Sequence, residues 1–449
     1  QPDSPYSGDS DRDGYRNKLF WGAVQHKFDN NFSGFFRGYG YTANSDYDQG
    51  AWGYPGGNDE AQNYNQSWDT GLRYNSGIYS SQLIANYQRL KDYNYSNELG
   101  RYAGDATLDD MEQRYIQWGN NVEVGHGAIS GGVDWKQEKL TSSSTTLSDV
   151  YKRDTTGLYL TGQQQIDSVT LEASGREDHD EQFGWHGTWQ TAAGWEFVDG
   201  YRATLSYGTS FLAPSLGQQF GATRYASQYY SGIAANPDLK PETSESFELG
   251  LYYSGEEGWL EGVQASVTTF QNNVDDRISI SRTANAKQAQ SYPNYVGLNA
   301  DGEPIFRYYN VNKARIRGVE TELKIPLADD WKLTLNYTYN DGRDISNGGN
   351  KPLSDLPFHT ANGTVDWKAT QDWSFYVQGN YTGEKRALTS SAATPGGYVI
   401  WNTGAAWQAT KSVKLRAGVQ NLLDKDLSRD DYSYTEDGRR YFVGVDYKF

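Results

Sequence analysis

The chain has 449 residues, more than one ordinary soluble core accommodates. It is rich in aromatic residues and glycine, with 36 Tyr, 14 Trp, 16 Phe and 49 Gly, but its mean hydropathy is -0.81, and the lack of any run of about 18 apolar residues excludes a transmembrane helix. The net charge of -17 argues against a nucleic-acid partner, and the absence of Cys excludes disulfides and thiolate metal sites.

In chain order, residues 1–8 read as a loop, and segments of alternating apolar and polar residues follow. A strand places successive side chains on opposite faces, so each such segment has one apolar and one polar face. Alternation with so many Tyr and Trp predicts strands between lipid and water, because the faces of a soluble sandwich would carry far fewer of them. The apolar stripes are Trp68, Thr70, Leu72, Tyr74; Phe247, Leu249, Leu251, Tyr253; Trp331, Leu333, Leu335, Tyr337, Tyr339; Trp373, Phe375, Val377, Tyr381; and Val413, Leu415, Ala417, Val419.

The connections between these segments alternate between short turns and long polar loops. The short turns are Asp29-Asn30-Asn31, Val198-Asp199-Gly200, Ala328-Asp329-Asp330, Thr370-Gln371-Asp372 and Thr410-Lys411-Ser412. The long loops lie near 42–66, 91–113, 212–243, 282–312, 340–359, 383–397 and 424–439. Bacterial barrels have short periplasmic turns and long extracellular loops, so we expect about 20 strands, an even number if both ends are periplasmic.

The last nine residues are a further alternating strand that ends on an aromatic residue. Its apolar face consists of Tyr441, Val443, Val445, Tyr447 and Phe449, while Phe442 is the one large apolar residue on the other face. Such a strand is expected to close an outer-membrane β-barrel, since an open edge would leave unpaired backbone groups in lipid. The sequence predicts an all-β, transmembrane antiparallel barrel in the bacterial outer membrane, over residues 1–449.

The sequence does not support an enzyme. It contains no nucleotide-binding loop and no HExxH motif, and chance pairs of carboxylates are expected in a chain with 57 Asp and Glu. We therefore assign no catalytic residues and no catalytic cofactor.

Several motifs resemble those of TonB-dependent outer-membrane receptors. They are Phe211-Leu-Ala-Pro-Ser-Leu216, Asn236-Pro-Asp-Leu-Lys-Pro-Glu242, Tyr309-Asn-Val-Asn-Lys-Ala-Arg-Ile-Arg-Gly-Val-Glu320 and Asn421-Leu-Leu-Asp-Lys-Asp426, followed by the terminal strand. Residues from about 9 to 216 resemble the cobalamin receptor, and residues from about 236 to 449 resemble the catecholate-siderophore receptor that also serves as the colicin I receptor. A natural recombinant and an engineered hybrid would look alike at the loop that joins them. The family's barrel has about 22 strands, and its plug domain, which carries the contact with TonB, is expected outside this chain.

The resemblance implies a calcium site in the first two long loops. Calcium takes six to eight oxygen ligands, which acidic loops supply at flexible spacing. The residues carried over are Asp48, Asp59, Tyr102, Asp105 and Asp109, although the spacing after Tyr102 departs from the family's pattern. The alternative is that these acids only keep the loops solvated.

A second cluster is basic and aromatic, which suits a bulky ferric catecholate anion because Arg and Lys supply charge and Tyr supplies stacking surface. Its members are Arg224, Tyr225, Tyr229, Tyr230, Arg282, Arg307, Lys385 and Arg386. The alternative is that they contact lipopolysaccharide phosphates or one another.

The resulting hypothesis is a receptor barrel for TonB-dependent uptake of a scarce, bulky nutrient, either a ferric siderophore or cobalamin. Outer-membrane lipid, lipopolysaccharide and TonB are its expected partners. The other hypotheses are a docking barrel for colicins or phage without transport of its own, which a plug in the full gene would exclude, and a passive porin, which conductance would reveal.

Overall fold

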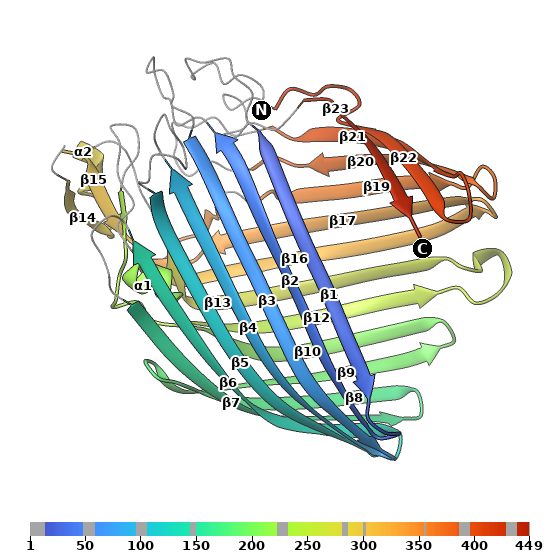
Figure 1. Cartoon of the computed structure of the whole chain (residues 1–449), viewed down its shortest axis with the longest axis horizontal. Coiled ribbons are helices and arrows are strands. Elements are labelled where there is room, and N and C mark those ends of the chain that lie inside the picture. Colours follow the sequence, from blue (N-terminus) through green and yellow to red (C-terminus); the bar gives the residue numbers. More distant parts are fainter. Residues whose placement is uncertain are drawn as a thin grey trace.

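The computed structural model describes residues 14–47, 59–95, 106–143, 150–221, 232–280, 286–299, 302–353, 356–385, 396–427 and 438–448. Its main sheet has 20 strands, all paired antiparallel, and curls into a barrel (Figure 1). The predicted fold class and the strand number of about 20 are confirmed. No helix in the described part is long and apolar enough to cross a membrane.

The barrel strands follow the chain order. They are β1 (Tyr15–Lys27), β2 (Phe32–Tyr47), β3 (Asp59–Ser76), β4 (Tyr79–Tyr95), β5 (Ala106–Val124), β6 (Gly127–Ser143), β7 (Val150–Ile166), β8 (Val169–Asp180), β9 (Gly184–Val198), β10 (Tyr201–Leu212), β12 (Glu242–Ser254), β13 (Gln264–Ser279), β16 (Tyr309–Ala328), β17 (Trp331–Asp344), the two-residue β18 (Lys351–Pro352), β19 (His359–Trp367), β20 (Trp373–Thr382), β21 (Tyr398–Gln408), β22 (Val413–Gln420) and β23 (Arg440–Tyr447).

Smaller elements lie in the long connections. They are α1 (Leu216–Phe220), β11 (Gly232–Ala234), η2 (Gly258–Leu260), α2 (Ala286–Ala289), β14 (Tyr295–Leu298), β15 (Pro304–Arg307) and η3 (Ser346–Gly348). β11, β15 and β14 form a separate three-stranded sheet, in which β11 runs parallel to β15.

All five predicted short turns lie between neighbouring strands, at one rim of the barrel. They join β1 to β2, β9 to β10, β16 to β17, β19 to β20 and β21 to β22. β1 starts at the opposite, long-loop rim, whereas β23 ends at the short-turn rim. The condition from which an even number of strands would follow, two ends at the short-turn rim, is therefore not met by the first described strand.

The first two long loops are shorter than predicted. β2 and β3 stay paired up to Tyr47 opposite Asp59, and β4 and β5 up to Tyr95 opposite Ala106. These strand ends are mostly polar, so they lack the regular alternation from which strands are predicted.

The predicted apolar stripes all lie on the outer face. Cross-strand neighbours share a face, and the register places Leu335 opposite Leu323, Val365 opposite Val377 and Leu415 opposite Val445. Near the short-turn rim, stacked rings follow one another around the wall, with centroids 5.0 Å apart for Trp331 and Trp367 and 5.4 Å apart for Trp367 and Phe375. Such a ring of aromatic residues is typical of the membrane interface.

The side chains of the terminal strand lie on the faces that the sequence predicts. Tyr441, Val443, Val445 and Tyr447 share the outer face with β22, and Phe442 points inward, where its ring lies over Gly418. Among the described residues β23 pairs only with β22, and β1 only with β2. Phe449 lies outside the described residues, so its part in closing the barrel stays a prediction.

Candidate functional site

The inner wall of the barrel is lined with ion pairs. The face opposite the apolar stripes carries Arg37 with Asp69 at 2.6 Å, and Arg176 with Asp134 at 2.7 Å. Arg176 also donates to Asp178 on its own strand. A lumen of this kind is wet and polar, which suits the passage or binding of polar ligands rather than a packed core.

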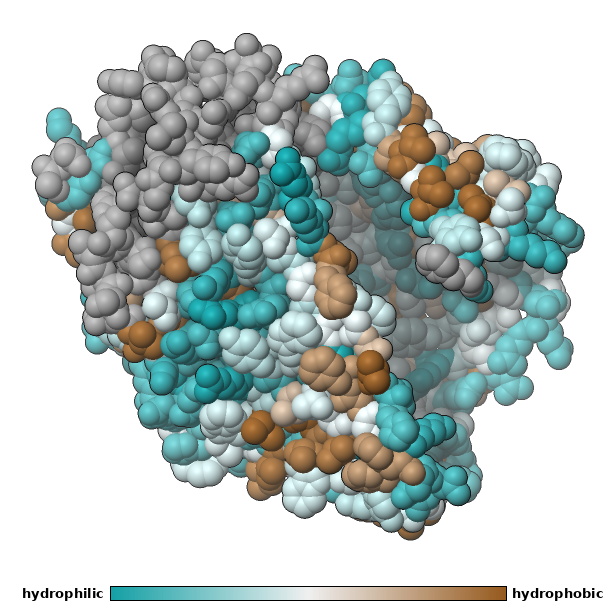
Figure 2. Space-filling model, viewed as in Figure 1, coloured by the Kyte–Doolittle hydropathy of each residue, from teal (hydrophilic) through white to brown (hydrophobic). Residues whose placement is uncertain are grey.

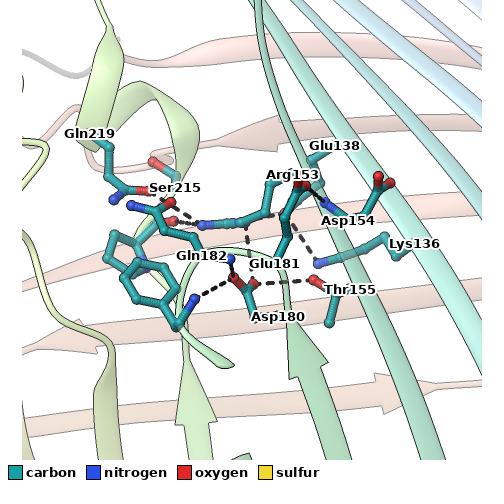
Figure 3. Close-up of polar contacts among 12 residues, drawn as sticks. Lys136, Glu138, Arg153, Asp154, Thr155, Asp180, Glu181, Gln182, Ser215 and Gln219 are labelled. Carbon is teal, nitrogen blue, oxygen red and sulfur yellow. Dashed lines mark hydrogen bonds and ion pairs between the residues drawn. The ribbon is translucent and has the colours of Figure 1, made fainter. Parts of the chain in front are cut away.

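The most buried of these inner cations is Arg153 on β7, whose side chain is 5% exposed (Figure 3). Its Nη2 donates to Glu138 at 2.8 Å, and its Nη1 donates to the backbone oxygen of Pro214 at 2.7 Å. Asp180 on β8 faces its Nε at 3.5 Å. One guanidinium thus connects the barrel wall with the chain segment that leads into α1.

Asp180 in turn fixes the turn after β8. Its Oδ1 accepts hydrogen bonds from the backbone N–H groups of Gln182 and Phe183, at 2.9 and 3.1 Å, and its Oδ2 accepts one from Thr155 (Figure 3). Asp180 is 2% exposed. A buried carboxylate with this many donors is held in one position.

Helix α1 packs against the inner wall beside Arg153. Ser215 and Gln218 form a capping box that starts the helix. The ring of Phe220 stacks on Tyr151 of β7, with centroids 4.5 Å apart. The short helix is therefore held by one cap, one ring contact and one buried arginine.

The chain segments on the two sides of residues 222–231 contact each other. The backbone N–H of Asn236 donates to the oxygen of Gln218 at 2.9 Å. The side chain of Asn236 donates to the oxygen of Tyr308, and β11 pairs with β15. Residues 222–231 themselves lie outside the described residues.

The recognised motifs meet at this place in the structure. The side chain of Asn310, in the motif that begins at Tyr309, accepts a hydrogen bond from the N–H of Lys240 at 2.9 Å and donates to its oxygen at 2.9 Å. Leu239 is 2% exposed. These motifs therefore have an architectural role, because they fix the base of the loop that follows α1.

Most of the predicted ligand-binding residues fall outside the described residues: Arg224, Tyr225, Tyr229, Tyr230, Arg282 and Arg386. Arg307 lies on β15 of the small sheet and is exposed, and Lys385 follows β20 and is half-buried. The first four lie in the segment 222–231, between α1 and β11.

Most of the predicted calcium ligands also fall outside the described part. Asp48, Tyr102 and Asp105 do so entirely, and Asp59 is placed only by its backbone, at the start of β3. Asp109 lies on β5 directly opposite Asp92 of β4, at the long-loop rim of the inner face. No group of three or more potential metal ligands occurs within the described ranges.

Sequence reasoning missed Arg153 and Asp92. The Ser215-x-x-Gln218 pattern could have predicted the start of α1. No local pattern pairs Arg153 with Glu138, or Asp92 with Asp109, since only the register brings these residues together.

The comparisons with known proteins agree on the fold. A model of the family described as TonB dependent receptor-like, beta-barrel, matches residues 3–422. The ferric enterobactin receptor of Pseudomonas aeruginosa, as a variant in complex with enterobactin, has a TM-score of 0.81 at 20% identity, covering 99% of this chain and 72% of that one. The siderophore receptor PirA of the same organism gives 0.76 at 19%, covering 97% and 71%. The copper transporter OprC gives 0.72 at 16%, covering 97% and 72%.

Proposed function

Because the chain belongs to the TonB dependent receptor-like β-barrel family, we propose that it serves in the outer membrane as the barrel of a receptor that takes up a ferric catecholate siderophore. The family consists of receptors rather than enzymes. Cobalamin uptake, which the first half suggests, is the competing proposal.

The held loop after α1 is the observation that carries this proposal. Residues 222–231 include Arg224, Tyr225, Tyr229 and Tyr230, a combination of charge and ring surface that suits a bulky metal–catecholate anion. Arg153 holds the segment before α1 at the inner wall, and Asn236, beyond the other end of this loop, donates to the backbone oxygens of Gln218 and Tyr308. A loop with fixed ends loses less conformational freedom when it captures a ligand.

The similar structures support this choice among ligands. One is a ferric enterobactin receptor with enterobactin bound, and another is a siderophore receptor. In our proposal the loops capture the iron complex at the long-loop rim, and TonB supplies the energy for its passage through the polar lumen.

Binding of an iron–tris-catecholate complex to the purified chain tests the proposal. We expect quenching of tryptophan fluorescence by the ferric complex, and little by cyanocobalamin. The variants Arg224→Gln and Lys385→Gln/Arg386→Gln should each weaken binding about tenfold, the contribution of one charge-assisted contact. Arg416→Gln at the short-turn rim is the matched control. Unchanged affinity in both loop variants, or preference for cyanocobalamin, would contradict the proposal.

We also propose that calcium orders the first two long loops. Asp92 and Asp109 face each other across β4 and β5 at the long-loop rim, beside the ends of both loops. Together with Asp48, Asp59, Tyr102 and Asp105 they would supply the oxygen ligands that calcium prefers.

Limited proteolysis between β4 and β5 tests the calcium proposal. We expect slower cleavage in calcium than in chelator, and we expect Asp92→Asn/Asp109→Asn to abolish this difference. Asp134→Asn, which alters a lumen carboxylate far from these loops in sequence, should preserve it. Equal cleavage of the unaltered chain in calcium and in chelator would disprove the idea.

A further inference from the structure

One row of residues across β3–β7 leaves a hollow in the inner wall. The register aligns, one from each strand, Arg73, Gln82, Gly119, Gly132 and Tyr159. Leu83 and Trp118, the chain neighbours of Gln82 and Gly119, are exposed on the outer face, where apolar side chains gather toward the short-turn rim (Figure 2). Since successive side chains alternate between faces, the row lies on the inner face.

Two glycines form the floor of this hollow. Gly119 and Gly132 lie directly opposite each other on β5 and β6, so no side chain fills the wall between Gln82 and Tyr159. The hollow has a volume of about 280 Å³, which is below the range of roughly 300–1,000 Å³ that drug-sized ligands occupy. A ligand here is therefore a small molecule.

Tyr159 forms one side of the hollow. Its hydroxyl oxygen lies 2.8 Å from the point that a Cβ on Gly119 would occupy, and 2.7 Å from the same point on Gly132. Gln117, which also lines the hollow, donates to this oxygen at 3.5 Å. Because the oxygen accepts that hydrogen bond, the hydroxyl hydrogen can be donated to a ligand.

Arg73 is the only charged residue among the described residues that line the hollow. Its guanidinium carbon lies 4.6 Å from the centroid of the Phe35 ring, and it forms no ion pair within the described ranges. Arg37 and Arg176 on the same wall are held by carboxylates instead. Arg73 is thus positioned by an aromatic face, which leaves its N–H donors for an oxyanion.

The other inner-face groups of the lining are neutral. Ser130 donates to Asn121 at 2.7 Å, so the amide nitrogen of Asn121 and the oxygen of Ser130 can still bond to a ligand. Amides and hydroxyls both donate and accept, which matches the hydroxyl groups of a ligand. A hard metal cation prefers carboxylate oxygens, and this lining supplies none.

We propose that this hollow binds a small polyhydroxylated anion. Its phosphate or carboxylate group lies on Arg73, and its hydroxyl groups bond to Asn121, Ser130 and Tyr159. The hollow lies near the short-turn rim, whereas β10 ends and β12 begins at the opposite rim. The inference is therefore independent of the ligand proposed for the loop after α1, and it requires only a wet inner face.

Isothermal titration calorimetry of the purified chain in detergent tests the inference. The probes are glucose 6-phosphate, citrate, inorganic phosphate and glucose. We expect saturable binding of glucose 6-phosphate or citrate, and the tighter of the two identifies phosphate or carboxylate as the preferred group. Inorganic phosphate should bind at least about tenfold more weakly than the tighter probe, because it leaves the neutral side chains unused. Glucose should also bind at least about tenfold more weakly, because it lacks the charge.

Two substitutions in the lining and one control locate the site. Arg73→Gln should weaken binding of the tighter anion at least about tenfold, since it removes the charge-assisted contact. Tyr159→Phe keeps the ring and removes one hydroxyl, so it should weaken binding about threefold. The matched control is Arg202→Gln, because Arg202 is an exposed inner-face arginine near the same rim, on β10, outside this hollow. Urea midpoints show whether each variant stays folded.

Glu123 supplies a change of the opposite sign, which damage to the fold would not imitate. It is exposed on the inner face of β5, two positions beyond Asn121 toward the short-turn rim. Its charge repels an anion in the hollow, so Glu123→Gln should tighten binding about twofold. The inference is overturned if neither anion binds saturably, if inorganic phosphate or glucose binds as tightly as both, or if Arg73→Gln and Arg202→Gln cause equal losses.

Discussion

Arg153 is the single residue on which the position of α1 depends most. Its guanidinium is the shared partner of Glu138, Asp180 and the oxygen of Pro214. Replacing a buried member of such a group leaves the other charges without compensation, whereas an exposed pair in water loses little. The inner wall of this barrel contains both kinds of pair.

We predict that Arg153→Met lowers the free energy of unfolding by about 3 kcal/mol. It should also expose the segment between β10 and β12 to proteases. Urea titration in lipid vesicles, followed by tryptophan fluorescence, measures the first effect, and limited proteolysis measures the second.

Arg416→Met is the control for this prediction. Arg416 pairs with Asp446 at 2.8 Å, but both side chains are about half exposed, 50% and 51%. Its loss should cost less than about 1 kcal/mol and leave the segment between β10 and β12 protected. Equal effects of the two substitutions would show that Arg153 does not hold α1.

At the scale of single elements, the pairing of β22 with β23 depends on a small residue. A Cβ on Gly418 would lie 2.5 Å from the ring of Phe442 and 2.8 Å from the backbone oxygen of Thr403. Phe442 breaks the alternation of the terminal strand, and the close approach of its ring to this glycine accounts for its place on the inner face.

Gly418→Ala should therefore lower the free energy of unfolding by about 1–3 kcal/mol, the usual cost of overpacking. Gly162→Ala on β7 is the control, because nothing lies within 4 Å of its added Cβ. Adding Phe442→Leu to Gly418→Ala should recover part of the loss, since the ring is what the new methyl group meets. Urea midpoints of the four proteins decide this, and equal costs at both glycines would contradict it.

The strands and turns follow from the sequence wherever a strand separates lipid from water. The two-residue alternation predicts the outward positions of Leu335, Val377 and Val445, and the polar residues predict the turn at Asp329-Asp330. Alternation gives no signal where both faces of a strand contact water, so the sequence predicts loops at the polar ends of β2 and β4. It also fails for Arg153 and Asp92, whose partners lie on other strands and depend on a register that local patterns do not specify.

For the whole molecule, the direction in which the apolar side chains of each strand point decides which surface contacts lipid. Each wall has an apolar outer face, which includes Leu160 at 62% exposure, and a polar inner face with its ion pairs. In water such an outer face would be an aggregation hazard. In a bilayer it stabilises the fold, because every apolar side chain there is in the medium that suits it.

Leu160→Arg tests this assignment. A cation on the lipid face near the middle of the bilayer should destabilise the barrel by about 2–4 kcal/mol in lipid vesicles. Gln163→Arg, three positions further along β7, lies on the inner face and is exposed, so it should be almost neutral. Urea midpoints in vesicles measure both substitutions. If the outer face met water instead, Leu160→Arg would cost no more than Gln163→Arg, and the alternating pattern would then need another explanation than a membrane.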